Sequence, residues 1–153
     1  MTLYFNSDAE VERIGRRLLD GSLPKAEWTH AGHFAAALWL LRARPDFDAS
    51  REMPGVIRAY NLATGVANTD SGGYHETITQ ASLHMARRVL ADRSPNEPLH
   101  EVHAALMASP LGQKDWPLAY WSHARLFSVE ARRGWVDPDL QPLPGWRTPV
   151  DRP

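Results

Sequence analysis

The fold is decided by the stretch of residues 28–44, WTHAGHFAAALWLLRAR. Its apolar residues recur at the three- and four-residue spacing of a helix face, which predicts a buried helix. Pro24 and Thr29 each suit a helix start, so the helix begins between them, and it ends by Arg44 because Pro45 follows. Strand-like alternation is nearly absent from the chain. The sequence therefore predicts an all-α protein.

Helical periodicity also dominates outside this stretch. Further helices are predicted over residues 8–19, 54–64, 74–91, 97–108, 116–127 and 128–133. Their short connections favour an antiparallel bundle of about five to six helices. Five prolines after residue 137 predict an extended C-terminal tail. We thus expect one helical domain over residues 1–136, followed by a tail over residues 137–153.

The composition limits the kinds of molecule that the protein is expected to bind. The net charge is −1, from 17 basic and 18 acidic residues, and no basic run marks a nucleic-acid surface. The longest apolar run, residues 34–41, is far shorter than the roughly 20 residues that span a bilayer. The chain has no cysteine, which excludes disulfides and thiol nucleophiles. We expect a cytoplasmic protein with neither nucleic acid nor membrane as partner, and the composition permits a homodimer.

A pair of histidines marks the candidate site. In a helix, His30 and His33 lie about 60° apart on the face that also carries Phe34, so both rings are expected to point inward. Glu76 interrupts an apolar stripe of the helix predicted over 74–91, where an unpaired carboxylate would be costly. Bundles build metal sites from facing helices. The sequence therefore predicts that His30, His33 and Glu76 bind a divalent metal ion, whether Zn, Fe, Mn, Ni or Cu.

Two neighbours of Glu76 complete this hypothesis. His75 would serve as a fourth ligand or general base, and Tyr74 as a proton donor. Three protein ligands leave a position for a water that the metal makes acidic. The resulting prediction is a small metal-dependent enzyme, of hydrolase or lyase type, acting on a small-molecule substrate in the bundle pocket.

Other interpretations of the same residues stay open. A histidine and a carboxylate in a dry pocket can perform acid–base chemistry without metal. Alternatively, the chain is a metal-free ligand-binding or regulatory module, in which Glu76 pairs with an arginine such as Arg58 and the histidines form a structural network. His100 and His103 share a helix face in a more exposed context and form a second candidate metal pair.

The loop before the helix of residues 74–91 is rich in turn formers. Residues 68–73, NTDSGG, predict a turn whose Asp70 or Ser71 caps that helix. The glycines precede a helix, but the pattern matches neither the phosphate-binding loop nor the dinucleotide fingerprint. We expect this loop to form a flexible lip over His75 and Glu76.

Overall fold

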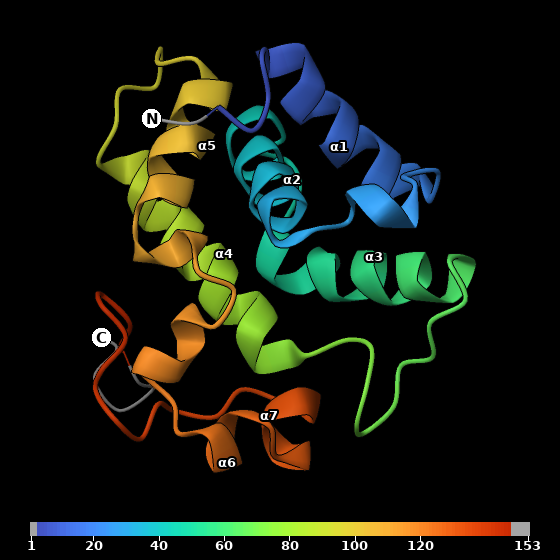
Figure 1. The fold of residues 1–153 in the computed structure, drawn as a ribbon, viewed down its shortest axis with the longest axis vertical. Helices are drawn as coiled ribbons and strands as arrows, with labels where there is room; N and C mark the ends of the chain where they lie inside the picture. The colour runs from blue at the N-terminus through green and yellow to red at the C-terminus, as the bar shows by residue number, and fades with distance from the viewer. Residues whose placement is uncertain (1–2, 148–153) are drawn as a thin grey trace.

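The structure is a computed structural model that describes residues 3–147, and every regular element in that range is a helix (Figure 1). The α-helices are α1 (Asp8–Asp20), α2 (His30–Ala43), α3 (Ala49–Ala63), α4 (Glu76–Ala91), α5 (Leu99–Ala108), α6 (His123–Leu126) and α7 (Val129–Arg133). Short 3-10 helices cover η1 (Lys25–Glu27), η2 (Pro110–Gly112) and η3 (Trp116–Ala119). The prediction of an all-α helical bundle is confirmed.

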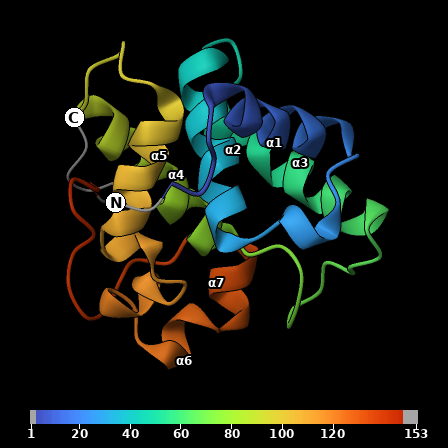
Figure 2. The same cartoon turned by 45° about the horizontal axis from the view of Figure 1, so that its top comes forward.

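Helix α2 forms the centre of the molecule. Every residue from Phe34 to Leu40 is buried, so this stretch is covered on all sides rather than along one stripe. It contacts α1, α3, α4 and α5. Figure 2 shows α1 and α3 on one side of α2, and α4 and α5 on the other. None of the helices formed by residues 3–147 is long and apolar enough to cross a membrane.

The predicted boundaries of the first two helices hold because local caps set them. Ser7 Oγ accepts a hydrogen bond from the Glu10 amide, and Gly21 ends α1 with a φ of 78°. Of the two starts proposed for the second helix, Thr29 is the one used, since its Oγ1 accepts from the Gly32 amide at 3.1 Å. Pro24 instead precedes the separate turn η1.

Helix α3 begins five residues earlier than predicted. We expected Pro54 to start it, but Asp48 caps it and Pro54 lies inside it. A proline offers no N–H to the carbonyl four residues before it, here that of Ser50. The side-chain amide of Gln80 on α4 donates to that carbonyl at 2.8 Å instead. Leu62, near the C-terminal end of this helix, is 66% exposed.

The single helix predicted over residues 116–127 is wrong. The chain forms η3, turns, and starts again as α6 because Ser122 caps the new helix. Asp139 fixes that turn by accepting hydrogen bonds from the Ser122 amide and hydroxyl, at 2.7 and 2.6 Å. The predicted short helix that ends at Gly134 is confirmed as α7.

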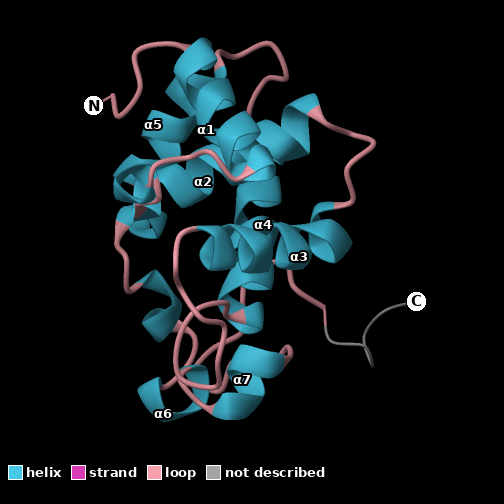
Figure 3. Cartoon of the chain, turned by 90° about the vertical axis from the view of Figure 1, so that its right-hand side faces the viewer, coloured by secondary structure: helices cyan, strands magenta, loops and turns pink. Residues whose placement is uncertain are grey.

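Residues 137–147 pack against the helices. Leu143 is 2% exposed and belongs to the core, and the rings of Trp135 and Trp146 stack at 4.1 Å between centroids. His84 of α4 is half-buried and hydrogen-bonds the Pro144 carbonyl at 2.6 Å. Figure 3 shows loop segments gathered around α6 and α7 at the lower end of the molecule.

Candidate functional site

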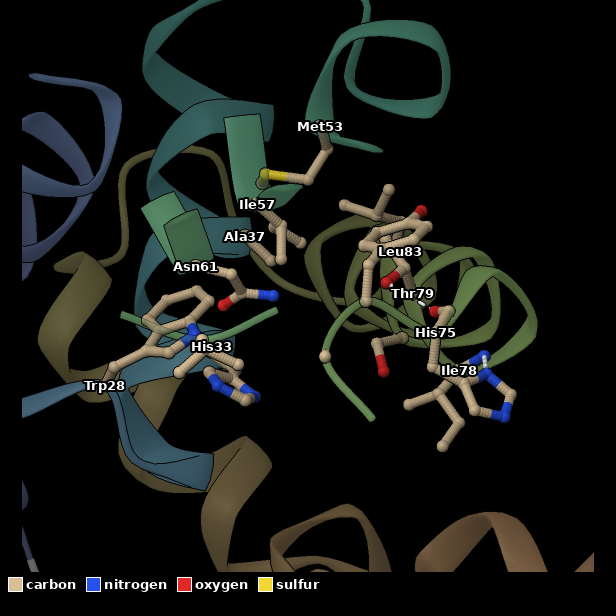
Figure 4. A pocket seen from close by; sticks show the side chains of 14 residues that line it. Trp28, His33, Ala37, Met53, Ile57, Asn61, His75, Ile78, Thr79 and Leu83 are labelled. Carbon is tan, nitrogen blue, oxygen red and sulfur yellow. Dashed lines mark hydrogen bonds between the residues drawn. The ribbon is translucent and has the colours of Figure 1, made fainter. Parts of the chain in front are cut away.

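A cavity of about 370 Å³ lies where α2, α3 and α4 meet. Side chains of α2 and α3 face those of α4 across it (Figure 4). Its walls are mostly apolar and are formed by Trp28, His33, Ala37, Met53, Ile57, Asn61, Val66, Gly73, Tyr74, His75, Ile78, Thr79, Ser82 and Leu83. We call it the Asn61 cavity. Such a combination of apolar walls and a few polar groups is typical of small-molecule sites.

His33 is the imidazole that this cavity leaves available. We predicted that it points toward the core or a cavity within it; it lines the cavity, while the next residue, Phe34, is buried. The ring packs against Trp28, with 4.0 Å between centroids. Neither ring nitrogen of His33 is hydrogen-bonded to any of the residues 3–147. Both nitrogens can therefore bind a ligand.

The protonation state of His33 follows from its surroundings. The ring lies against Trp28 in the wall of the cavity, and desolvation by the surrounding protein lowers its pKa to about 4. The positive charge of Lys114 acts in the same direction. The ring is thus neutral at pH 7, with one nitrogen as donor and the other as acceptor.

Asn61 supplies a second polar group whose orientation is fixed by the backbone. The Tyr74 amide donates to Asn68 Oδ1 at 3.0 Å, and Asn68 Nδ2 donates to the Arg58 carbonyl at 3.1 Å. These bonds make Asn68 Oδ1 an acceptor, so the Asn61 nitrogen must be the one that donates to it, at 2.9 Å. Asn61 Oδ1 remains as an acceptor in the wall of the cavity.

A second cavity of about 470 Å³ adjoins the first. We call it the Lys114 cavity, and it is lined by Trp28, Thr29, His30, His33, Phe34, Ile78, Ser82, Lys114, Trp116 and Pro117. Four of these residues, Trp28, His33, Ile78 and Ser82, line both cavities. The Ser82 hydroxyl has no hydrogen-bond partner among the described residues. One ligand could therefore contact both spaces around this shared wall.

His30 differs from His33 because one of its ring nitrogens is hydrogen-bonded to the protein. Its Nε2 donates to the Leu111 carbonyl on η2 at 2.7 Å. The two rings share one side of α2, as predicted, and both line the Lys114 cavity. Only His33 also lines the Asn61 cavity.

Glu76 has a partner other than the predicted arginine. The Tyr74 hydroxyl donates to Glu76 Oε1 at 2.5 Å, and the guanidinium of Arg58 lies over the Tyr74 ring, 4.5 Å from its centroid. Tyr74 is 3% exposed, and burial raises the pKa of its hydroxyl. Glu76 is half-buried and lines neither cavity, so the carboxylate that we expected to be buried in the site lies at its edge.

His75 is the N-terminal cap of α4, the role that we had predicted for Asp70 or Ser71. Its Nδ1 accepts from the Ile78 amide at 3.1 Å, so Nε2 carries the proton and donates to the Leu126 carbonyl at 2.7 Å. Both nitrogens are therefore engaged. A role as general base or metal ligand would require one of these bonds to break.

The predicted metal ligands are not gathered at one point. Among residues 3–147, no three histidine, aspartate or glutamate side chains are grouped so that they could hold a metal ion. The metal site of His30, His33 and Glu76 thus stays a prediction that would need rearrangement. The second candidate pair is also dispersed, because His100 binds Asp8 while His103, expected to be more exposed, is fully buried and bonds the Ala31 carbonyl.

The loop over residues 66–73 closes one side of the Asn61 cavity, through Val66 and Gly73. Its tip is attached to α7, because Asp70 forms a two-pronged ion pair with Arg133 at 2.6 and 2.7 Å. Gly73 has a φ of 80°, and a side chain there would meet the Ala67 carbonyl.

Compared with protein-family models, curated proteins and solved structures, the chain matches none of them. The site is therefore argued from its geometry alone. Sequence reasoning missed Trp28, Asn61, Ser82 and Lys114 as wall residues. For Asn61 a signal was present, since asparagine is unfavourable inside a helix and one on a buried face calls for a partner.

Proposed function

We propose that this chain binds a small, mainly apolar molecule in the Asn61 cavity and holds it by hydrogen bonds to His33 and Asn61. The observation that carries the proposal is the state of His33. It is a neutral imidazole in the cavity wall, and neither of its nitrogens is bonded to the described protein.

The shape and chemistry of the cavity support the proposal. Its volume of about 370 Å³ falls within the range of about 300–1,000 Å³ that small-molecule pockets occupy. Met53, Ile57 and Leu83 provide an apolar surface, so burial of a ligand's apolar part drives binding. His33 and Asn61 add orientation, because a ligand that leaves them without hydrogen bonds loses affinity.

The experiment uses 1-octanol as an apolar probe that carries one hydroxyl. We expect saturable binding by NMR, with shifts centred on the amides of His33, Asn61 and Ser82. Ser82→Leu should abolish these shifts, because the larger side chain fills the shared wall and removes no protein hydrogen bond. The matched control is Ala59→Leu at an exposed position of the same bundle. Shifts elsewhere, or shifts unaffected by Ser82→Leu, would overturn the proposal.

A metal-dependent hydrolase or lyase is the second candidate function. It is favoured by the same neutral His33, since neutral imidazole is the form that binds metals. Protein purified without a histidine tag and dialysed against Zn²⁺ tests it. Stoichiometric zinc that is lost in both His33→Ala and Glu76→Gln would support this candidate. Zinc that is absent, or retained in both variants, would rule out the predicted ligand set.

A further inference from the structure

We propose that the ligand is a monoanion, with its carboxylate beside Lys114 and its apolar part in the Asn61 cavity. This inference rests on the proposed function and names the class of molecule bound there. It follows from the charges around the two cavities and from their shared wall.

The full charge in the walls of the two cavities is positive. Among the described residues that line the Asn61 and Lys114 cavities, Lys114 carries a full charge, and no aspartate or glutamate is present. The nearby carboxylates already have partners, since Glu27 pairs with Arg13 and Glu76 accepts from Tyr74. Asp115 lies beyond, in the wall of a third space next to Lys114.

Lys114 is also available. It is exposed and makes no ion pair or hydrogen bond with any other residue in the range 3–147. Its charge acts on His33, whose surroundings include no counteracting carboxylate. An anion placed between Lys114 and His33 would therefore be stabilised by the ammonium and by the imidazole N–H.

The dipole of α2 adds to the positive potential in the Lys114 cavity. Thr29 and His30, at the start of α2, line the Lys114 cavity, so the positive end of the dipole of this 14-residue helix lies there. Lys114 supplies one full positive charge and the dipole about half a charge more, which is enough to balance a single carboxylate. A dianionic phosphate would retain an unbalanced charge, because His33 stays neutral at pH 7. A single carboxylate is the better match.

The shared wall connects this head group to the apolar space. Trp28, Ile78 and Ser82 border both cavities, so an unbranched or aromatic body can extend from the Lys114 side toward Met53 and Leu83. The structure thus favours an amphipathic monocarboxylic acid over a wholly apolar molecule. The hydrogen bonds of Asn61 would then act on a polar group along the body of the ligand.

Three probes with the same eight-carbon chain test the inference: octanoate, 1-octanol and octylamine, measured by calorimetry at pH 7 and low salt. Octanoate should bind more tightly than 1-octanol, by up to about fivefold, the upper end of the range expected for one solvent-exposed charge pair, and octylamine should bind more weakly than either. Lys114→Gln should remove the advantage of octanoate and leave 1-octanol unchanged. The matched control is Lys25→Gln, which neutralises the chain's other lysine on η1.

A second measurement does not depend on affinity. Bound octanoate should raise the pKa of His33, followed by NMR of the ring, because a negative charge favours the imidazolium. Bound 1-octanol should not raise it.

The outcomes separate the two proposals. If 1-octanol binds in the cavity but octanoate gains nothing, the monoanion inference fails while the proposed function stands. If octanoate keeps its advantage in Lys114→Gln, the inference also fails, because the anion then lies elsewhere. If none of the three probes binds, the proposed function fails and the inference fails with it.

Discussion

The side chain of Gln80 on α4 hydrogen-bonds the backbone carbonyl of Ser50 on α3, with 2.8 Å between nitrogen and oxygen. This is the carbonyl that Pro54 leaves without a donor inside the helix. The bond allows α3 to continue through a proline, and it joins the two helices that face each other across the Asn61 cavity.

We expect Gln80→Ala to lower the free energy of unfolding by about 1–2 kcal/mol, because a partly buried carbonyl loses its donor. In a Pro54→Ala background the same change should cost less, since alanine restores the backbone N–H. Urea denaturation of the four proteins in this double-mutant cycle measures the coupling. Equal costs in both backgrounds would show that Gln80 does not compensate for the proline.

Acid should destabilise the fold through His75. Burial lowers the pKa of this ring in the folded state, so the unfolded chain binds a proton at higher pH than the folded chain. The stabilisation is complete above the unfolded pKa of about 6.5 and is lost as pH falls toward the folded pKa. Protonation would also occupy Nδ1, the atom that caps α4.

Replacing His75 by Asn keeps a capping acceptor and removes the titration. Stability measured in urea at pH 7, 6 and 5 should fall less steeply for His75→Asn than for the unmodified protein. A residual slope is expected, because burial also lowers the pKa values of His84 and His103. Identical slopes for the two proteins would contradict this role of His75.

Asn68 connects the loop of residues 66–73 to the wall of the cavity. It makes three hydrogen bonds, to Asn61, Tyr74 and Arg58. Asn68→Ala should lower the free energy of unfolding by about 1–3 kcal/mol and weaken the binding of 1-octanol, because Asn61 loses the partner that orients it. Asn68→Asp keeps the acceptor oxygen and should retain more of both properties. If Asn68→Ala binds 1-octanol normally, the orientation of Asn61 is not required.

Two glycines should respond in opposite ways to alanine. A Cβ at Gly112 would lie 1.8 Å from the Met107 carbonyl oxygen, which is backbone and must shift, so Gly112→Ala should destabilise. A Cβ at Gly55, inside α3, meets nothing within 4 Å, so Gly55→Ala should stabilise by about 0.5–1 kcal/mol. Thermal unfolding of both variants gives the signs, and a stabilised Gly112→Ala would contradict the packing at η2.

Local signals accounted for much of the fold. The caps of α1 and α2 and the apolar stretch of α2 could be read directly from neighbouring residues. The start of α3 is also set by a local cap, Asp48, and not by the Pro54 that we predicted. The continuation of the helix through Pro54 could not be predicted, because it depends on Gln80, 30 positions from the carbonyl that it satisfies. The break between η3 and α6 likewise depends on Asp139, 17 positions from Ser122.

The sequence predicted the position of the candidate site more accurately than the roles of its residues. Helical spacing placed His30 and His33 together, but whether a ring faces a packed core or a cavity depends on how fully other helices fill the space. The hydrogen-bond partners of Glu76 and His75 could not be predicted from the sequence either. A hydroxyl two residues away and a carbonyl 51 residues away decide what these side chains do.

The burial of Leu143 has a consequence for biosynthesis. A nascent chain that has grown only to residue 136 contains the residues of every α-helix found in residues 3–147, but it lacks this core residue and the Trp146 ring that stacks on Trp135. The ribosome releases the chain from its N-terminus onward. Final closure of the hydrophobic core must therefore wait until residues 137–147 have left the ribosomal exit tunnel.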